Sequence, residues 1–439
     1  MKQVHIATFG CQMNERDSQT MARVMNGCDY RITERMEQAD LILINTCSIR
    51  RKAEEKTYSL LGRLKDLKNR NPGLVIGVGG CVAQQEGPRL LERVPHLDLV
   101  FGTRMIHQLP ALIEEVRSGK NRLSRIEMVQ GELYVRDLLM APGCSPGLKA
   151  SVTIMQGCNN YCAYCVVPYV RGPEESRGSR EILAEVEALA AEGVQEILLL
   201  GQNVNSYGLN REGELTFAGL LDLLEKVPGL ERIRFTTSHP KDLSPELMGC
   251  FGRIANLCEH IHLPVQAGSN SVLERMNRGY TRQDYLKKID QLKARCPGIA
   301  ITSDFIVGFP SETEADFEET MDLVKAVQFD DIFSFKYSNR PQTPASNFPD
   351  QVAEEEKGRR LMELQTYQKK VTLSKHQTLV GTIQQVWVEG NSKKSPQDRM
   401  GRTRTNKIVN FPGPPDLLGK TVPVRIEKAY INSLKGVVV

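Results

Sequence analysis

Short apolar runs recur along the first part of the chain, and each one ends at a cysteine. VHIATFGC ends at Cys11, LILINTC at Cys47 and LVIGVGGC at Cys81. Such runs are typical of buried parallel strands, and the stretches between them, SQTMARVMNG and RKAEEKTYSLLGRLKDLKNR, resemble helices. We therefore predict a parallel α/β domain over residues 1–145. Because the carboxyl ends of parallel strands share one edge, where ligands bind, the three cysteines should meet there.

The alternation of apolar runs and amphipathic stretches continues over residues 146–375. Strands are expected at 151–156, 195–200, 231–236, 260–265, 300–307 and 331–337. Helices are expected between them, for example at 181–193 and 216–227, and a further helix at about 353–376 follows a Pro-rich connector. This number of β/α units is short of a complete eight-unit barrel, so we predict a partial (β/α)6 barrel with its chemistry on the loops after the strands.

From residue 376 the pattern changes to short strands with Gly and Pro turns, which predicts a small all-β barrel over 376–439. This region is rich in basic residues between Asn391 and Lys407. Small barrels with basic loops bind RNA through its phosphates. The candidate RNA-binding residues are Lys393, Lys394, Arg402 and Arg404. A solvated charged loop is the alternative.

The length, net charge and cysteine count of the chain are compatible with many functions and exclude few. The chain has 439 residues, enough for two to four domains, and a net charge of +4, which permits a nucleic-acid partner without requiring one. It contains no run of about 18 apolar residues and no apolar stretch at its start, so we expect a soluble, cytoplasmic protein with no membrane partner. Its 11 cysteines are an odd number without a secretion signal, which favours metal or catalytic roles over disulfides.

The strongest chemical signal is the C-x₃-C-x₂-C array of Cys158, Cys162 and Cys165, directly after the first strand of the predicted partial barrel. Thiolates ligate zinc, iron–sulfur clusters or copper, and structural zinc needs four ligands. A [4Fe–4S] cluster has four irons, so three cysteines leave one iron open to a substrate or cofactor. Three buried structural thiols remain the alternative here. For Cys11, Cys47 and Cys81 the alternatives to a second cluster are strand-end thiols and a zinc site.

The cysteine array, in this position, resembles the radical S-adenosylmethionine superfamily, and the whole three-part chain resembles its methylthiotransferase family. FGCQMNERDS, GCNNYCAYCVVPYVRGPEESR and GRTRTNKIVNFPG are most similar to the tRNA-modifying branch, and the C-terminal region resembles a TRAM domain. The branch that modifies a ribosomal protein has a Pro-Lys-Asn-type segment after the first cysteine, whereas Gln12 follows Cys11 here. One departure is Gln342 in RPQTPA, where the family commonly has glycine.

The resemblance implies two [4Fe–4S] clusters, one on each set of three cysteines, and S-adenosylmethionine on the open iron of the barrel cluster. It also implies that cofactor-binding groups follow the barrel strands. The candidates are Gln202, Asn203, Ser238, Gln266 and Asp304, with His239 beside them. Arg171 and Arg177, just past the cysteine array, are candidates for a contact with RNA or cofactor. No catalytic side chain is assigned, because the cofactors carry the difficult steps.

The activity that this family implies is methylthio transfer to C2 of an N6-isopentenyladenosine just 3′ of a tRNA anticodon. The expected partners are the tRNA anticodon loop, a flavodoxin- or ferredoxin-like electron donor, and a donor that restores the cluster's sulfur. Two alternatives stay open. One is a methylthiotransferase acting on a threonylcarbamoyl-adenosine or a ribosomal-protein aspartate, and the other is a non-enzymatic iron–sulfur protein that binds RNA.

Overall fold

The structure is a computed structural model, which describes residues 1–48, 51–120, 122–128, 147–393, 395 and 397–439. The described residues form two compact units. The first unit contains the described residues up to 128 together with Ser151–Asn159 and Val166–Arg177. The second contains residues 147–150, Asn160–Cys165 and Gly178–Val439. In the described part of the chain, no helix is both long enough and apolar enough to cross a membrane.

The first unit is built on a six-stranded parallel sheet of order β2-β1-β3-β4-β5-β6. Its strands are β1 (Lys2–Phe9), β2 (Tyr30–Ile32), β3 (Leu41–Thr46), β4 (Val75–Gly80), β5 (Leu99–Phe101) and β6 (Leu123–Arg125). The three strands expected from the apolar runs are β1, β3 and β4, and they are neighbours in the sheet. The predicted parallel α/β domain is therefore confirmed. The short strands β2, β5 and β6 extend the sheet beyond the prediction.

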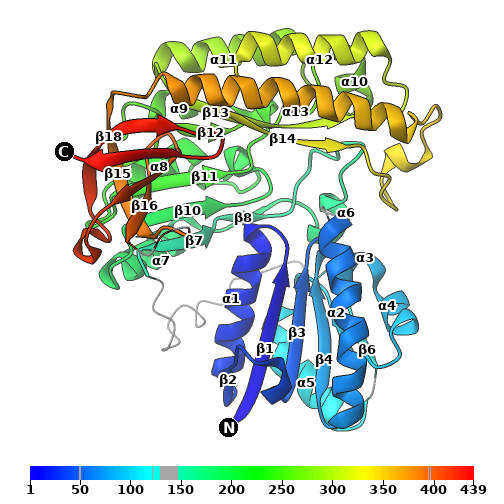
Figure 1. The fold of residues 1–439 in the computed structure, drawn as a ribbon. Coiled ribbons are helices and arrows are strands. Elements are labelled where there is room, and N and C mark those ends of the chain that lie inside the picture. Colours follow the sequence, from blue (N-terminus) through cyan, green and yellow to red (C-terminus); the bar gives the residue numbers. More distant parts are fainter. Residues whose placement is uncertain (49–50, 121, 129–146, 394, 396) are drawn as a thin grey trace. The chain divides into compact units, whose positions relative to one another are not determined.

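Helices cover both faces of this sheet (Figure 1). They are α1 (Gln12–Asn26), α2 (Arg51–Arg70), α3 (Cys81–Glu86), α4 (Pro88–Arg93) and α5 (Leu109–Arg117). Successive side chains of β3 point to opposite faces of the sheet and therefore pack against different helices. Leu43 packs in one core with α1 and α5, whereas Ile44 packs in the other core with α2. Burial on both faces explains why β3 reads as a continuous apolar run.

The second unit continues with parallel strands and helices in alternation. Its first sheet has the order β11-β10-β7 and its second the order β12-β13-β14. The strands are β7 (Lys149–Thr153), of which only residues 149 and 150 belong to the second unit, β10 (Glu196–Leu200), β11 (Arg232–Thr236), β12 (His260–His262), β13 (Ala300–Val307) and β14 (Asp331–Lys336). The main helices are α7 (Ser179–Ala191), α8 (Phe217–Leu224), α9 (Pro245–Cys250), α10 (Asn270–Arg275), α11 (Arg282–Arg295) and α12 (Glu314–Val327). The partial β/α barrel predicted from the sequence is confirmed.

One predicted strand differs from the structure. The run at 151–156 is divided between β7 and a separate short strand, β8 (Met155–Gln156). In the first unit, β8 pairs antiparallel with β9 (Glu175–Ser176), and α6 (Val167–Arg171) lies between them in the sequence. The cysteine array therefore follows a two-residue strand at the end of a bent segment, because the apolar run continues past the end of β7.

A long helix leads to a closed five-stranded barrel at the C-terminal end of the chain. Helix α13 (Glu354–Gln377) runs beside β14 (Figure 1). The barrel has the order β15-β16-β17-β19-β18, and its strands are β15 (Ile383–Asn391), β16 (Asp398–Arg402), β17 (Ile408–Pro412), β18 (Thr421–Ala429) and β19 (Leu434–Val438). Val386, Phe411 and Val424 are among its core residues. The predicted all-β barrel is confirmed, although β16 and β19 were not expected.

Candidate cluster and cofactor site

Cys11, Cys47 and Cys81 lie at the carboxyl ends of β1, β3 and β4, which are adjacent parallel strands. The thiol of Cys47 forms a hydrogen bond with Cys11, and this bond is the main cause that lowers the pKa of Cys11 to about 6. Burial opposes the shift, and the charge of Arg171 supports it. Cys81 is close enough to Cys11 for the two thiols to influence each other's charge. The expected convergence is therefore present, and one of the thiols favours the thiolate form.

Glycines beside these cysteines allow the strand ends to approach each other. A Cβ at Gly10 would stand 2.8 Å from the Cβ of Cys47. A Cβ at Gly80, which has φ +90°, would stand 2.4 Å from Oδ1 of Asn45. Asn45 Nδ2 in turn donates to the carbonyl oxygen of Asn14, at 2.8 Å. The polar contacts beneath the thiols are fixed by these asparagines, and a larger residue at either glycine would displace them.

Arg171 stands beside the three cysteines within the first unit. Its side chain is buried, Nη2 lies 2.6 Å from Oδ2 of Asp17, and its charge acts on the thiols of Cys11 and Cys81. Burial raises the pKa of Cys81, and Arg171 partly offsets this effect. Arg177 is also buried, and its Nη1 donates to the carbonyl oxygen of Thr153 at 2.7 Å. Burial leaves neither arginine facing solvent, which does not favour the contact with RNA considered from the sequence.

In the portion of the chain described here, no group of three or more cysteine, histidine or carboxylate side chains is spaced to hold a single metal ion. A [4Fe–4S] cluster needs thiolates that stand farther apart, because iron and sulfide atoms lie between them. The donor set at Cys11, Cys47 and Cys81 consists of thiols beside an arginine, which suits an anionic, thiolate-bound cluster better than a lone ion.

In the second cysteine array, Cys158 belongs to the first unit, and Cys162 and Cys165 belong to the second. Within the second unit, the N–H of Cys165 donates to the carbonyl oxygen of Cys162 at 2.9 Å. The buried thiol of Cys162 lies 3.9 Å from Nε2 of His239 and accepts a hydrogen bond from Nη1 of Arg278 at 3.2 Å. Burial, and then the charge of Arg278, lower the pKa of His239 to about 2, so its imidazole is neutral.

Two of the predicted cofactor-binding residues, Ser238 and Gln266, carry a buried side-chain oxygen that has no hydrogen-bond partner among the residues that the structure describes. These atoms are Oγ of Ser238 and Oε1 of Gln266, whereas Oδ1 of Asp304 lies 3.3 Å from Nε2 of His262. Gln266 also has φ +78°, and its N–H donates to the carbonyl oxygen of Asp304 at 2.9 Å, which places the two residues side by side. A buried polar atom without a partner costs about 1–3 kcal/mol, so these atoms mark where the donors of a polar ligand would bind.

The other two predicted cofactor residues follow β10. Asn203 is buried, its Oδ1 accepts from the N–H of His239 at 3.0 Å, and its Nδ2 donates to Asp242 at 2.7 Å. Asn203 therefore fixes the loop that carries Ser238 and His239. Gln202 is partly buried at the same strand end. The structure places both residues at the carboxyl ends of the strands, as expected, but the amide of Asn203 already has protein partners.

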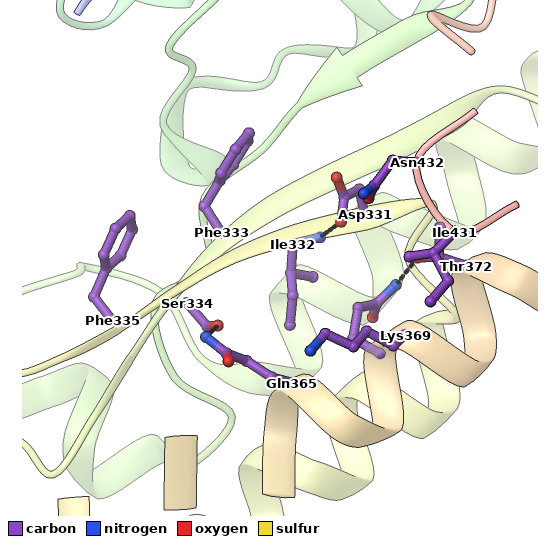
Figure 2. Close-up of a pocket in the computed structure, with 11 residues that line it drawn as sticks. Asp331, Ile332, Phe333, Ser334, Phe335, Gln365, Lys369, Thr372, Ile431 and Asn432 are labelled. Atoms are coloured by element: carbon purple, nitrogen blue, oxygen red, sulfur yellow. Dashed lines mark hydrogen bonds between the residues drawn. The ribbon is translucent and has the colours of Figure 1, made fainter. Parts of the chain in front are cut away.

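The last strand, β14, presents two phenylalanines to the same face as Asp304. Phe333 is the registered partner of Asp304, and its ring lies 5.9 Å from that of His262. Figure 2 shows Phe333 and Phe335 pointing away from α13, whereas Ile332 points toward it. The two phenylalanine side chains are 49% and 41% exposed. An exposed aromatic surface thus adjoins the carboxylate of Asp304, whose Oδ1 lies 3.3 Å from Nε2 of His262.

A groove of about 340 Å³ lies between β14, α13 and the loop at Ile431 and Asn432 (Figure 2). Its polar side chains include Gln365 and Lys369. Because Ile332 faces this groove and Asp304 lies on the opposite face of the sheet, we do not place the candidate cofactor site in the groove.

The predicted RNA-binding residues of the terminal barrel have different surroundings. Lys393 is exposed, and Lys394 lies outside the described residues. Arg402 lies 3.2 Å from Glu389, and Arg404 lies 2.7 Å from Glu259. Two of the four candidates thus pair with carboxylates of their own chain. Their role in RNA binding stays a prediction.

The loop that carries Arg404 caps the amino-terminal ends of strands in the second unit. Glu259, its partner, directly precedes β12, and Asp330, which pairs with Lys407 at 2.7 Å, directly precedes β14. Arg234 donates to the carbonyl oxygens of residues 403 and 404. The loop therefore lies at the strand ends opposite to those that carry Ser238 and Gln266.

Sequence reasoning did not identify Arg278, Phe333 or Phe335. Arg278 is 116 residues from Cys162 along the chain, so no spacing rule links them. The run DIFSFK was read only as a strand. Its alternation of Phe with polar residues is the signal that could have shown one face to be exposed.

Comparison with known protein families divides the chain into three matched regions. Residues 3–102 match the family described as uncharacterized protein family UPF0004. Residues 152–324 match the radical SAM superfamily, and residues 377–439 match the TRAM domain.

Two relatives illustrate the similarity over the full length of the chain. A protein of Geobacter metallireducens, named tRNA-2-methylthio-N(6)-dimethylallyladenosine synthase, is 54% identical over 99% of this chain and 98% of its own length. A protein of the same name from Carboxydothermus hydrogenoformans is 48% identical over 100% of this chain and 99% of its own.

Solved structures with a similar fold are far more distant in sequence. The radical S-adenosylmethionine methyltransferase TsrM from Kitasatospora setae has a TM-score of 0.57 at 12% identity, over 79% of this chain and 74% of that one. The cobalamin-dependent S-adenosylmethionine radical enzyme OxsB has a TM-score of 0.53 at 13% identity, over 79% and 55%. At this identity the likeness shows the fold alone.

Proposed function

The chain belongs to the tRNA-2-methylthio-N(6)-dimethylallyladenosine synthases, a family of radical S-adenosylmethionine methylthiotransferases, and on this basis we propose that it adds a methylthio group to C2 of N6-isopentenyladenosine beside a tRNA anticodon. The observation that carries the proposal is the meeting of Cys11, Cys47 and Cys81 beside Arg171. A second thiol-lined site, in addition to the C-x₃-C-x₂-C array, provides a place for the sulfur that the product gains.

Two [4Fe–4S] clusters fit the residues present. Cys158, Cys162 and Cys165 would hold one cluster, and Cys11, Cys47 and Cys81 would hold the other. When bound, these groups with S-adenosylmethionine supply the 5′-deoxyadenosyl radical and the sulfur and methyl groups of the product.

The protein's own part is to bind, orient and exclude water. The unpaired oxygens of Ser238 and Gln266, with the carboxylate of Asp304 beside Gln266, would accept hydrogen bonds from the amino and hydroxyl groups of S-adenosylmethionine. The neutral imidazole of His239 adds no charge beside Cys162.

The exposed pair of Phe333 and Phe335 is our candidate surface for the substrate base. Aromatic side chains stack on nucleobases regardless of sequence, and the isopentenyl group adds apolar area that a phenylalanine can cover. The position of Phe333 beside Asp304 would bring the base close to the cofactor residues. Correct placement matters, because an error of about 1 Å at the reacting atom can cost about a hundredfold in rate.

The proposed partners follow from the chemistry. We propose that an anticodon loop is the RNA partner, because its bases can be splayed out of the stack and reached at C2. We also propose a flavodoxin- or ferredoxin-like electron donor and a donor of sulfur, since the cleavage of S-adenosylmethionine is started by one electron and each product retains one sulfur atom that must be replaced.

The test is nucleoside mass spectrometry of tRNA incubated anaerobically with reduced enzyme and S-adenosylmethionine. We expect a methylthio mass gain on isopentenyladenosine, with one 5′-deoxyadenosine and one S-adenosylhomocysteine formed for each product. Unmodified tRNA, the same RNA with unprenylated adenosine, is the matched control and should gain little. Equal turnover on both RNAs, or a gain only on a threonylcarbamoyl-adenosine or on a ribosomal protein, would contradict the proposed substrate. Absence of 5′-deoxyadenosine would favour a non-enzymatic RNA-binding protein.

A further inference from the structure

Arg278 is a buried cation of the second unit. Its side chain is 4% exposed. The guanidinium donates to Sγ of Cys162 at 3.2 Å, the hydroxyls of Tyr164 and Tyr280 at 3.3 and 3.0 Å, and the carbonyl oxygen of Pro264 at 2.6 Å. Among the residues that the structure describes, no Asp or Glu forms an ion pair with it. The thiol of Cys162 is the one of these partners that could ligate a metal as a thiolate.

The surrounding side chains add positive rather than negative charge. Lys288 Nζ donates to the carbonyl oxygens of Pro240 and Leu243, at 2.8 and 3.0 Å, in the turn that follows His239, whose ring lies 3.9 Å from the thiol of Cys162. The carboxylate of Asp242 already pairs with Lys241 and accepts from an asparagine. Burying a charge costs several kcal/mol unless an opposite charge or strong hydrogen bonds compensate for it. The fold therefore maintains a positive potential at Cys162 that only an anionic group would balance.

We propose that Arg278 is a positioning residue for the cluster held by the C-x₃-C-x₂-C array, binding Cys162 through an N–H···S bond and stabilising the reduced cluster. This inference rests on the proposed function, which makes Cys162 a cluster ligand. A cluster bound by three thiolates is net negative, and the electron that it accepts makes it more so. Hydrogen bonds to the sulfurs and a nearby positive charge raise the reduction potential of such a cluster.

The two tyrosines hold the guanidinium without cancelling its charge. Burial raises the pKa of Tyr280 to about 12, and it also raises that of Tyr164. Both hydroxyls therefore stay neutral, and the hydroxyl of Tyr280 is further held by donating to the carbonyl oxygen of Val265 at 2.9 Å. The planar fork of arginine can bond the sulfur, the hydroxyls and a carbonyl at once, which a lysine ammonium cannot do with the same geometry.

The experiment uses the full chain with Cys11, Cys47 and Cys81 all changed to Ala, so that one cluster remains. Arg278→Met and Arg278→Lys are compared with Arg253→Met, which removes a charge from a side chain that is 54% exposed. The readout is potentiometric titration of the reduced cluster by electron paramagnetic resonance. We expect Arg278→Met to lower the ratio of reduced to oxidised cluster at a fixed potential about tenfold, which is about 59 mV for one electron. Arg278→Lys should restore most of this loss, and Arg253→Met should have no effect.

The outcomes separate this inference from the proposed function. Loss of all iron from the parent triple variant would contradict the assignment of Cys158, Cys162 and Cys165, and the inference would fall with it. An unchanged potential in Arg278→Met, or an equal fall in Arg253→Met, would overturn the role of Arg278 alone. If the Arg278→Met variant does not bind iron, the Arg278→Lys variant distinguishes a role of the charge from a role in packing. Loading near the parent potential supports the role of charge, and failure of a folded Arg278→Lys protein to load would make Arg278 a packing residue.

Discussion

At the scale of single residues, Gln342 occupies a backbone conformation that favours glycine. The N–H of Thr343 donates to the carbonyl oxygen of Arg340 at 3.2 Å, so residues 340–343 form a tight turn. Pro341 stands at its second position, and Gln342, at the third, has φ +72°. This is the pattern of a type II turn, whose third position normally carries Gly or Asn. Glycine, which the resemblance to the methylthiotransferase family led us to expect here, adopts this conformation without strain.

We predict that Gln342→Gly stabilises the protein by about 0.5–1 kcal/mol. A left-handed conformation costs an L-residue about 1–2 kcal/mol, and the greater freedom of glycine in the unfolded chain returns part of that gain. The side chain of Gln342 is exposed, so its removal should cost little packing. The measurement is the midpoint of urea unfolding. Gln351→Gly, at an exposed position without a positive φ, is the control and should lower the midpoint. A lower midpoint for both variants would contradict the strain argument.

The strand pattern predicted which cysteines lie together, but it did not predict the side chains that surround them. Cys11, Cys47 and Cys81 could be placed together because parallel strands end at one edge and the spacing was regular. Arg278 could not be found, because it reaches Cys162 across 116 residues of sequence. The unpaired oxygens of Ser238 and Gln266 follow from tertiary packing, and a sequence shows only that polar residues end the strands.

At the scale of elements, β14 is an edge strand of its sheet, and it carries two exposed phenylalanines. Its strand character was predicted from the apolar pattern. Which face would be open could not be predicted, because the opposite face is covered by α13, a helix from a later segment (Figure 2). The short strands β2, β5, β6, β16 and β19 were missed for a related reason, since three- and five-residue strands depend on the neighbours that pair with them.

We predict that Phe333→Ala and Phe335→Ala each raise KM for an isopentenylated anticodon stem-loop about tenfold. Loss of a base-stacking side chain costs about 1–3 kcal/mol. Cleavage of S-adenosylmethionine in the absence of RNA should be unchanged, because these rings are not assigned to the cofactor. Met362→Ala, on α13 with 65% exposure, is the matched loss of an exposed apolar side chain and should have no effect.

Two results would contradict this role for β14. One is an unchanged KM in both phenylalanine variants. The other is a loss of RNA-independent cleavage, which would move the rings from the substrate base to the adenine of the cofactor. Steady-state kinetics with modified and unmodified stem-loops distinguishes them.

At the scale of the whole molecule, some of the basic side chains of the terminal barrel form ion pairs with carboxylates of the same chain. Arg404 and Lys407 pair with Glu259 and Asp330, which precede β12 and β14. The clustering of basic residues in the sequence does not reveal these ion pairs, because the carboxylates lie more than 70 residues away along the chain. The three-part architecture could be predicted from local sequence patterns. Whether a basic side chain of the barrel pairs with a carboxylate or faces solvent depends on tertiary packing within the second unit, which those patterns do not show.

Two exposed cations of the barrel lie on β18 and β19, away from the basic segment between Asn391 and Lys407. Lys428 and Lys435 face each other across β18 and β19, and both are exposed. Like charges directly opposite on a sheet repel each other, so a phosphate placed between them would be favourable. Tyr430, 50% exposed at the adjoining turn, offers a ring for stacking. We therefore expect this surface to contribute more to RNA binding than Arg402 and Arg404.

The corresponding prediction concerns the salt dependence of tRNA binding. Each phosphate contact with a flexible strand contributes about 0.7 to the slope of log affinity against log salt, because neutralising a phosphate releases counterions. Replacing Lys428 and Lys435 together with Gln should therefore flatten the slope by about 1.4. Arg404→Gln should leave the slope unchanged and instead lower the unfolding midpoint, because it leaves the carboxylate of Glu259 without its ion-pair partner. Filter binding from low to moderate salt, with calorimetry of each variant, measures both quantities. A slope flattened by Arg404→Gln at unchanged stability would return RNA binding to the loop at 402–407, where the sequence alone had placed it.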